Sequence, residues 1–417
     1  MSYENKILQM KKMLGKKATG KVEKPSFLKP AKPAYVKQWQ DAGLEMIEND
    51  FGILFKREVC YPLDYQHGNY KLGELFGVLS RWTTHEANHP FAMTDDETIV
   101  FFDTETTGLK GAGTHIFLLG FLEAKEEEFV LTQYVLADPS NEAALLFESK
   151  LWQRHVTIVS YNGKSFDWPQ LQVRWTLNQQ HIPKLKLQRQ VDLLHSTKRL
   201  WKDDLAKMKL TQVEKEKLGF LRQGDIPGHL APIIYFDAVK SGDATTLMKV
   251  LVHNEWDLLS LITLYVHSSH LLFQQVEEES ATTFTNIGKW FGDLKQRQVS
   301  ADILKTVTEK FNANEAGFAY FYLAFELKRT GNYSLAVEAF HTALPALPLI
   351  KQLQAYEQLA ILYEHKLKDY QKAHIFAEVG KQLVQTLTFA KFEQQQKQIH
   401  NWEKRLFRLQ RKMNFES

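Results

Sequence analysis

TIVFFDTETTGL, residues 98–109, is the stretch of sequence that decides the fold. Its first half is rich in β-branched and aromatic residues, which predicts a buried strand. Asp103 and Glu105 come at the end of this strand, and residues two apart on a strand point to the same face. Adjacent carboxylates repel each other and are costly to bury, whereas a hard cation such as Mg²⁺ prefers oxygen ligands. The pair therefore indicates either a metal site or a charged strand end in solvent. Thr106 follows it in a turn that lets backbone approach a ligand closely.

The length of 417 residues leaves room for two or three domains. The chain has 52 basic and 49 acidic residues, so net charge gives no argument for nucleic-acid binding. The lysines are unevenly distributed, because residues 1–40 contain ten of them and only two acidic residues. We interpret residues 1–34 as a flexible, solvated arm, with non-specific phosphate contacts as an additional role.

Cysteine content and hydropathy indicate the cellular compartment. Cys60 is the only cysteine, which excludes an internal disulfide. The N-terminal lysines are not followed by the apolar segment of a signal peptide. No stretch approaches the roughly 20 apolar residues that cross a bilayer. We therefore expect a soluble, cytoplasmic protein without a membrane partner.

Local patterns divide the rest of the chain into four parts. Residues 35–95 show a mixed pattern and are predicted to form an N-terminal extension that packs on the next domain. Residues 96–275 alternate strand and helix patterns, which indicates an α/β domain. Residues 276–315 are predicted to be a helical connector, and residues 316–417 an all-α repeat region that ends in a basic capping helix.

The repeat region has small and aromatic residues at recurring positions. The first copy contains Tyr320, Leu323, Ala324, Tyr333, Ala336, Phe340 and Ala343, and the second contains Leu359, Ala360, Tyr363, Tyr370, Ala373 and Ala377. The pattern looks like two tetratricopeptide repeats, whose period is about 34 residues. The second copy departs from it by one residue between Tyr363 and Tyr370. Such repeats form a groove, so we expect a protein or peptide partner on their concave face.

Two further carboxylates stand at positions that suit a shared site. Asp167 follows the turn Asn162-Gly163-Lys164 at the start of a predicted helix, where the simpler interpretation is an N-cap. Asp257 borders the apolar stripe of a long predicted helix, one turn after His253. The simpler interpretation there is a His–Asp pair. That interpretation leaves the Asp103–Glu105 pair unexplained, whereas one metal centre accounts for all four acids.

These motifs resemble a known family in their order and wording. Asp103-x-Glu105, Asp167 and Asp257 match the three motifs of the DEDD exonuclease superfamily, which has a ribonuclease H-like fold. The segments FFDTETTGL, SYNGKSFDWPQL, VDLLHSTKRLW and HNEWDLLSL look like those of YprB-type bacterial proteins, which join this domain to tetratricopeptide repeats. The resemblance covers about residues 95–275. It implies an α/β fold with a mixed sheet flanked by helices, followed by the helical repeats.

The resemblance also implies a mechanism. Asp103, Glu105, Asp167 and Asp257 would hold two Mg²⁺ or Mn²⁺ ions. The superfamily has a general base near its last Asp, a Tyr four residues before it in one branch and a His five before it in another. Here His253 stands four residues before Asp257, a histidine at the tyrosine spacing. It remains on the same helix face and is the predicted base.

Substrate contacts and function follow from the same comparison. Asn162 and Lys164 are candidates for orienting the terminal sugar or phosphate, although plain turn chemistry explains them equally well. Arg199, together with Lys202, is a weaker candidate for backbone contact. The predicted function is a metal-dependent 3′→5′ exonuclease acting on DNA or RNA, with a single-stranded end as the expected substrate. The alternatives are a structure-dependent endonuclease and a catalytically weak scaffold that recruits proteins through its repeats.

Overall fold

The computed structural model describes residues 27–85, 89–108, 113–276, 278–388 and 392–416. Most of the predicted Lys-rich arm and Leu109 therefore lie outside the described residues. Among the helices that are described, none is both long and apolar enough to cross a membrane.

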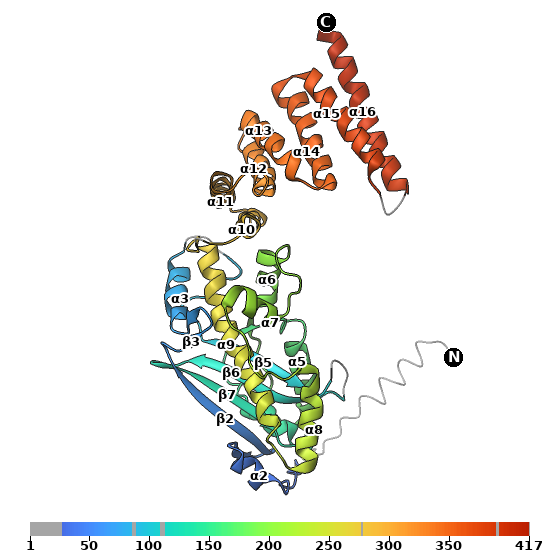
Figure 1. Cartoon of the computed structure of the whole chain (residues 1–417). Helices are drawn as coiled ribbons and strands as arrows, with labels where there is room; N and C mark the ends of the chain where they lie inside the picture. The colour runs from blue at the N-terminus through green and yellow to red at the C-terminus, as the bar shows by residue number, and fades with distance from the viewer. Residues whose placement is uncertain (1–26, 86–88, 109–112, 277, 389–391, 417) are drawn as a thin grey trace, which may run out of the picture.

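A seven-stranded mixed sheet forms the centre of the first two thirds of the chain (Figure 1). Its strands lie in the order β1-β2-β7-β6-β5-β8-β9. β8 and β9 run parallel to β5, and the other neighbours are antiparallel. The predicted mixed sheet is confirmed. The strands span Glu45–Asn49 (β1), Gly52–Pro62 (β2), Ile99–Thr106 (β5), Ile116–Ala124 (β6), Glu128–Leu136 (β7), Thr157–Ser160 (β8) and Arg189–Asp192 (β9).

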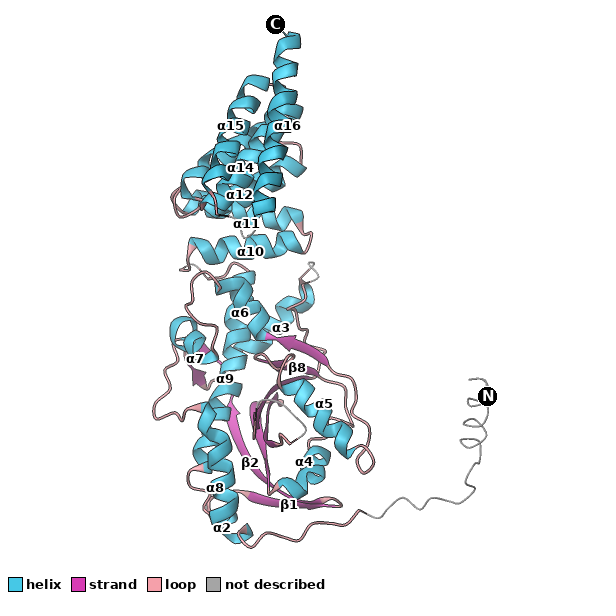
Figure 2. Ribbon diagram, turned by 90° about the vertical axis from the view of Figure 1, so that its right-hand side faces the viewer, coloured by secondary structure: helices cyan, strands magenta, loops and turns pink. Residues whose placement is uncertain are grey.

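Alternation along β5 places two hydrophobic cores on opposite faces of the sheet. Val100 and Phe102 lie in one core and Phe101 in the other, because successive side chains of a strand point to opposite sides. Helices cover both faces (Figure 2). The Phe101 side is covered by α3 (Glu74–Thr84), α6 (Leu193–Trp201) and most of α9 (Leu247–Leu272). The Val100 side is covered by α4 (Glu142–Glu148), α5 (Asp167–Asn178) and α8 (Ala231–Ser241).

Residues 35–95 are built into this domain. β2 pairs with β7 along nine positions from Leu54 to Pro62, so β1 and β2 extend the central sheet. α3 packs on α9 from the outside. The short elements are α2 (Val36–Asp41), β3 (Gln66–His67), β4 (Tyr70–Lys71), η1 (Pro139–Asn141), α7 (Leu210–Val213), η2 (Glu214–Leu218) and η3 (Gly228–Leu230).

The C-terminal part is helical, as predicted, and it is not separated from the sheet domain by a loose connector. α10 packs on α6, and Ile287, Phe291 and Leu304 belong to the same core as Phe101 and Tyr265. α10 and α11 therefore lie between the sheet domain and the remaining helices (Figure 1). The helices are α10 (Ala281–Asp293), α11 (Arg297–Lys310), α12 (Gly317–Arg329), α13 (Tyr333–Ala343), η4 (Leu344–Ala346), α14 (Leu349–Leu362), η5 (Tyr363–Leu367), α15 (Tyr370–Thr386) and α16 (Phe392–Glu416).

Helices α12 to α16 form a third core. α12 packs on α13, α14 on α15, and α15 on α16. The one-residue departure between Tyr363 and Tyr370 lies at η5, a π-helical turn that ends α14 and is followed by Lys368 with a φ of 59°. A left-handed residue is a common way to end a helix. Identification of these pairs as tetratricopeptide repeats stays a prediction.

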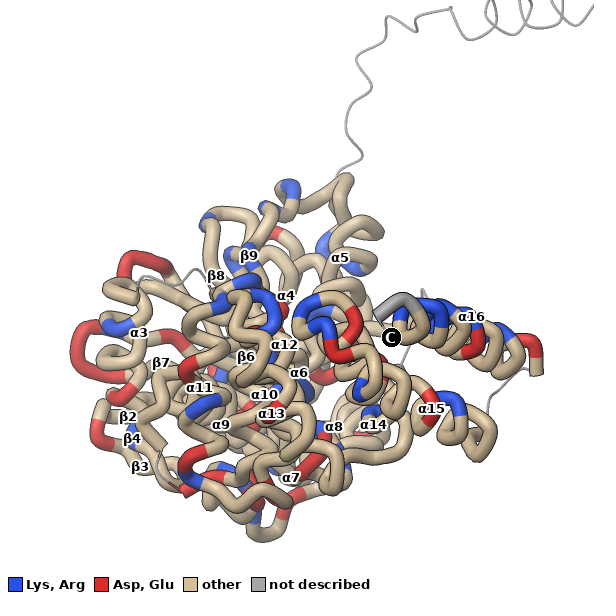
Figure 3. The backbone as a smooth tube through the Cα atoms, turned by 90° about the horizontal axis from the view of Figure 1, so that it is seen from above, with Lys and Arg blue, Asp and Glu red and all other residues tan. Residues whose placement is uncertain are grey.

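The last helix, α16, is held by a buried charge. Lys and Arg positions recur along α16 (Figure 3), and three of them surround the fully buried Glu364 of η5. Arg408 donates to both carboxylate oxygens at 2.6 and 2.8 Å, and Lys412 Nζ lies 2.9 Å from Oε1. Arg405 adds a longer ion pair of 3.5 Å. A buried carboxylate is tolerated here because its partners surround it.

We expect the docking of α16 to weaken in acid. Although burial alone would raise the pKa of Glu364, the hydrogen bonds from Arg408 and Lys412 lower it to about 2. The unfolded-state pKa is higher, so the pairing stabilises the fold above about pH 4.5 and is lost as the pH falls towards 2. Hydrogen exchange of α16, corrected for intrinsic rates, should increase over this range. Glu364→Gln should expose α16 already at pH 7, whereas Glu378→Gln, on the surface of α15, should not. Unchanged exchange at pH 2.5 would contradict the role of Glu364.

Candidate active site

The end of β5 carries the first two carboxylates. Asp103 and Glu105 are two residues apart on a regular strand, so both face α9. A β-bulge follows between Glu105 and Thr106, and the chain leaves the sheet there. Both side chains are partly buried. The predicted pair on one strand face is therefore present, at the edge of a core.

Asp167 reaches the same region from α5. It is the first residue of that helix, and Phe166 occupies the N-cap position without a side-chain cap bond. The N-cap interpretation of Asp167 is therefore wrong. Its buried carboxylate instead accepts a hydrogen bond from the hydroxyl of Thr104, which links α5 to β5. The preceding turn contains Asn162 with a φ of 66°, a conformation that asparagine tolerates better than most residues.

The third element is α9, which supplies His253 and Asp257. His253 Nε2 lies 3.5 Å from Asp257 Oδ2, as expected one helical turn apart. One ligand atom from each of Glu105, His253 and Asp257 lies within 4.8 Å of the other two. Residues that are up to 152 positions apart in the sequence (257 − 105) are thus within reach of a single ion.

The carboxylates strongly affect one another. Burial raises the pKa of Glu105 to about 8, and the charges of Asp257 and Asp167 add to this. The pKa of Asp103 is raised well above its usual value by burial and then by Asp257, Asp167 and Glu105. Burial also raises the pKa of Asp167 to about 6, against the hydrogen bond from Thr104. The site therefore holds more negative charge than its surroundings compensate, and oxygen ligands of this kind fit a hard divalent cation.

Two site residues that the sequence analysis did not identify come from the segment between η2 and η3. Arg222 Nη2 lies 2.5 Å from Asp257 Oδ1 and from Glu214 Oε1. Asp225 Oδ1 lies 2.6 Å from Nδ1 of His253. This irregular segment has no hydrophobic periodicity, so no local pattern could assign it to the site.

Asn254 is a third missed residue, and it fixes Asp103. Its Nδ2 donates to Asp103 Oδ2 at 2.8 Å. Its Oδ1 accepts from Gln133 Nε2 at 2.8 Å, and Gln133 Oε1 accepts from Arg57 at 2.8 Å. Because Arg57 only donates, it orients the Gln133 amide and thereby the Asn254 amide. The sequence did contain a signal for this residue, because Asn254 interrupts the apolar stripe of the helix three residues before Asp257.

The neighbouring strand leaves room for this contact. Gly120 on β6 is paired with Asp103 in the sheet, and a Cβ on Gly120 would lie 2.3 Å from Asn254 Oδ1. Any larger residue at this position would displace the amide.

Replacing Asn254 should therefore cost stability as well as activity. In Asn254→Ala the buried Nε2 of Gln133 loses one acceptor and Asp103 loses its donor, so we expect about 1–3 kcal/mol of destabilisation. Denaturant unfolding measures this loss. Gly120→Ala should give a comparable defect by steric displacement, and Gly113→Ala, where an added Cβ has open space, should be silent. An Asn254→Ala protein with unchanged stability would show that the network does not hold Asp103.

The predicted substrate-binding residues lie in two places. The Thr106 hydroxyl donates to the carbonyl of Gly108 at 2.9 Å, so it stabilises the turn after β5. The backbone N–H groups of Asn162 and Lys164 donate to Asp192, at 2.8 and 3.2 Å. Arg199 lies on α6, where it pairs with Asp293 of α10 at 3.1 Å and lies over the ring of Trp290. Lys164 and Arg199 line one cavity together, whereas Thr106 does not line it.

Comparison with known proteins identifies the family of the chain. A model of the ribonuclease H superfamily matches residues 100–269, which include all four carboxylates and His253. The chain is also 35% identical over 392 residues to YprB, an uncharacterized protein of Bacillus subtilis (strain 168). That match covers 91% of this chain and 93% of the relative, so it extends well beyond the ribonuclease H-like domain. The chain therefore belongs to the YprB family of proteins, whose sheet domain is a member of the ribonuclease H superfamily.

Proposed function

We propose that this protein is a metal-dependent nuclease that hydrolyses phosphodiester bonds of DNA or RNA as a 3′→5′ exonuclease. The ribonuclease H-like domain indicates nuclease chemistry in general. The observation that carries the more specific proposal is the cluster of Glu105, His253 and Asp257 within reach of a single ion, with the charges of Asp103 and Asp167 nearby. Such a group is poorly explained as a structural feature, because it opposes folding when no cation is bound.

The four carboxylates would hold Mg²⁺ or Mn²⁺. When bound, such ions stabilise charge on the phosphoryl and leaving oxygens and lower the pKa of a coordinated water. Glu105 and Asp257 lie, with His253, within reach of one ion, whereas Asp103 and Asp167 are outside that cluster and would have to approach it when metal binds.

His253 is suited to accept the proton of the attacking water. Asp225 accepts a hydrogen bond from Nδ1–H, which leaves Nε2 as the unprotonated nitrogen on the side of Asp257. Asp225 therefore orients the base, and His253 acts on the water. Asn162 and Lys164, on the turn before Asp167, would contact the sugar or phosphate of the terminal nucleotide.

A second candidate function is a catalytically weak scaffold. The ion pair between Arg222 and Asp257 favours it, because it compensates one of the four charges that a metal would need. A folded full-length protein that neither binds Mn²⁺ nor cleaves any substrate would support this candidate.

Cleavage of labelled oligonucleotides tests the proposal. Single-stranded DNA and RNA of about 20 nucleotides, labelled at the 5′ end, should be shortened progressively in Mn²⁺ and remain intact in EDTA. A 3′-phosphorothioate linkage should block the reaction, whereas cleavage of circular single strands would indicate an endonuclease. Asp103→Asn should abolish the ladder, whereas Asp138→Asn, at the start of η1 and outside the carboxylate group, should not. Undiminished cleavage by Asp103→Asn would refute the proposed site.

A further inference from the structure

Four adjacent cavities form a continuous path from the turn before Asp167 to α14. Their volumes are about 210, 540, 350 and 430 Å³. Each shares lining residues with the next: Arg199 and Trp290 join the first two, Lys289 joins the second and third, and Tyr322 and Lys351 join the third and fourth. We call this path the basic groove. It is lined by Lys164, Arg199, Lys289, Trp290, Tyr322 and Lys351.

Positive charge is concentrated in the second cavity. It is lined by Lys198, Lys202 and Lys289 together with Arg199, and its single acidic residue is Asp293. Asp293 pairs with Arg199. Within the described part of the chain, the three lysines have no carboxylate within ion-pair distance. Burial and then the charges of Lys289 and Lys202 lower the pKa of Lys351, which shows how close these ammonium groups lie. An anion bound among them would relieve this repulsion.

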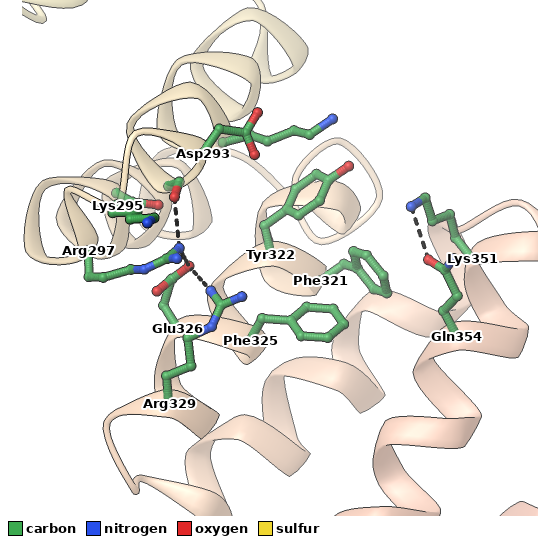
Figure 4. Close-up of a pocket in the computed structure, with 13 residues that line it drawn as sticks. Asp293, Lys295, Arg297, Phe321, Tyr322, Phe325, Glu326, Arg329, Lys351 and Gln354 are labelled. Carbon is green, nitrogen blue, oxygen red and sulfur yellow. Dashed lines mark hydrogen bonds and ion pairs between the residues drawn. The ribbon is translucent and has the colours of Figure 1, made fainter. Parts of the chain in front are cut away.

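Positive charge is only partly compensated at the far end of the groove. In the fourth cavity, Arg297 and Arg329 both pair with Glu326, at 3.1 and 2.5 Å (Figure 4). Lys351 Nζ contacts the neutral Gln354 at 3.0 Å. The third cavity includes the carboxylates of Asp203 and Glu315. The uncompensated charge thus begins at α6 and α10, between the sheet domain and the C-terminal helices, and continues to Lys351 of α14.

Aromatic rings lie beside the cations. Lys289 Nζ lies 5.4 Å from the ring centre of Tyr322, and Arg199 lies 5.4 Å from that of Trp290. Phe318 is 38% exposed and stacks on Tyr322 with ring centres 6.5 Å apart. Cations beside the half-buried Tyr322 and the exposed Phe318 suit single-stranded nucleic acid, whose phosphates need positive charge and whose unpaired bases stack on aromatic faces. Paired bases would leave the rings without a role.

The other end of the groove lies at the turn that precedes Asp167. Lys164 lines the first cavity and belongs to the turn that precedes Asp167. On the same turn, a Cβ added to Gly163 would lie 3.2 Å from Asp167 Oδ2. The turn at residues 162–165 therefore lies between Asp167 and the groove.

We propose that single-stranded nucleic acid lies in the basic groove, with its phosphates on Lys198, Lys202 and Lys289 and its bases on Tyr322 and Phe318. The C-terminal helices are then part of the substrate-binding surface. That the end of this strand enters the carboxylate site rests on the proposed function, whereas binding in the groove does not.

Binding and cleavage are measured separately to test this. Fluorescence anisotropy with a labelled single-stranded 16-mer, in the full-length Asp103→Asn protein, reports binding without cleavage. Replacing Lys198, Lys202 and Lys289 together by glutamine should weaken binding at least tenfold at moderate salt. It should also reduce the slope of log affinity against log salt by about 2, because each single-strand phosphate contact contributes about 0.7. Tyr322→Leu should weaken binding by about tenfold without changing that slope.

A matched control removes three exposed lysines elsewhere. Lys71, Lys125 and Lys305, on β4, the β6–β7 turn and α11, are replaced by glutamine together, with the same change in net charge. This variant should bind like the parent protein. Thermal unfolding shows whether the groove variant keeps the parent's stability. If it does not, the single Lys202→Gln and Tyr322→Leu variants are compared instead, and each should still weaken binding.

The outcomes separate this inference from the proposed function. In protein with Asp103 intact, the groove variant should lose much more of its rate on a 16-mer than on a trinucleotide, which is too short to span the groove. Groove-dependent binding without any cleavage would support the groove and refute the nuclease. If the protein cleaves nucleic acid but the groove variant and the control variant bind the 16-mer equally, the nuclease is supported and the groove is refuted. Equal affinity for a duplex, or stronger competition by an acidic peptide than by the unlabelled 16-mer, would overturn the assignment to single strands.

Discussion

Asp167→Asn should reduce metal-dependent cleavage on the order of 10³-fold while leaving the fold intact. A carboxylate that holds a catalytic ion contributes several kcal/mol to transition-state stabilisation, and each 1.4 kcal/mol is tenfold in rate. Asparagine keeps the shape of aspartate but not its charge. As Phe166 occupies the N-cap position, loss of a cap does not complicate the result.

The stability of Asp167→Asn should not fall with its activity. Burial and the neighbouring acids raise the pKa of Asp167 to about 6, above its unfolded value. The folded state therefore binds protons more tightly, and this carboxylate lowers stability increasingly as the pH rises from about 4 through 6. At pH 7.5 without metal, Asp167→Asn should unfold at the same or a slightly higher temperature, because the repulsion is removed.

Cleavage rate, metal titration and thermal unfolding together check this prediction. Added Mn²⁺ should raise the unfolding temperature of the parent protein more than that of Asp167→Asn. Asp138→Asn is the matched control, because Asp138 is only partly buried and its Oδ1 accepts from the backbone N–H of Ser140, as an asparagine can. An Asp167→Asn protein that cleaves at the parent rate would remove Asp167 from the metal site and the nuclease proposal with it.

His253→Ala should lower turnover by a factor of about 10² to 10⁴, the range for loss of a positioned general base. The contact between its Nδ1 and Asp225 fixes which nitrogen faces the site, so Asp225→Ala should lower turnover as well, by loss of orientation. His253→Tyr should recover part of the rate, since it recreates the tyrosine spacing of one branch of the exonuclease superfamily.

The pH profile and the metal affinity separate the roles of His253. As a base, it gives the parent protein an acidic limb in the pH–rate profile, which His253→Ala loses, and metal affinity changes little. As a ligand beside Glu105 and Asp257, its loss would weaken metal binding strongly. His229→Ala, an exposed histidine on η3, serves as the control. Full activity of His253→Ala from pH 6 to 9 would exclude the base.

The local sequence was sufficient to predict the site wherever the period of a single strand or helix decides which residues share a face. β5 was predicted from its β-branched and aromatic run, and the period of two places Asp103 and Glu105 together whatever the rest of the chain does. α9 was predicted from its apolar stripe, and the helical period places His253 and Asp257 together. The one-residue departure near Tyr363 was likewise visible in the spacing of the second repeat, and the π-helical turn η5 lies at that position.

Contacts between elements were decided only by tertiary packing. Nothing in the local sequence distinguishes Asp167 as an N-cap from Asp167 as a buried carboxylate bound by Thr104, because both begin a helix after a turn. Arg222 and Asp225 lie in an irregular segment, so their approach to α9 depends on where the flanking helices pack. Arg199 stays a candidate for contact with the nucleic-acid backbone, and the packing of α6 on α10 places it beside Asp293 in the basic groove. Periodicity fixes which face of an element a side chain occupies, whereas the partner of that face depends on how distant parts of the chain fill one core.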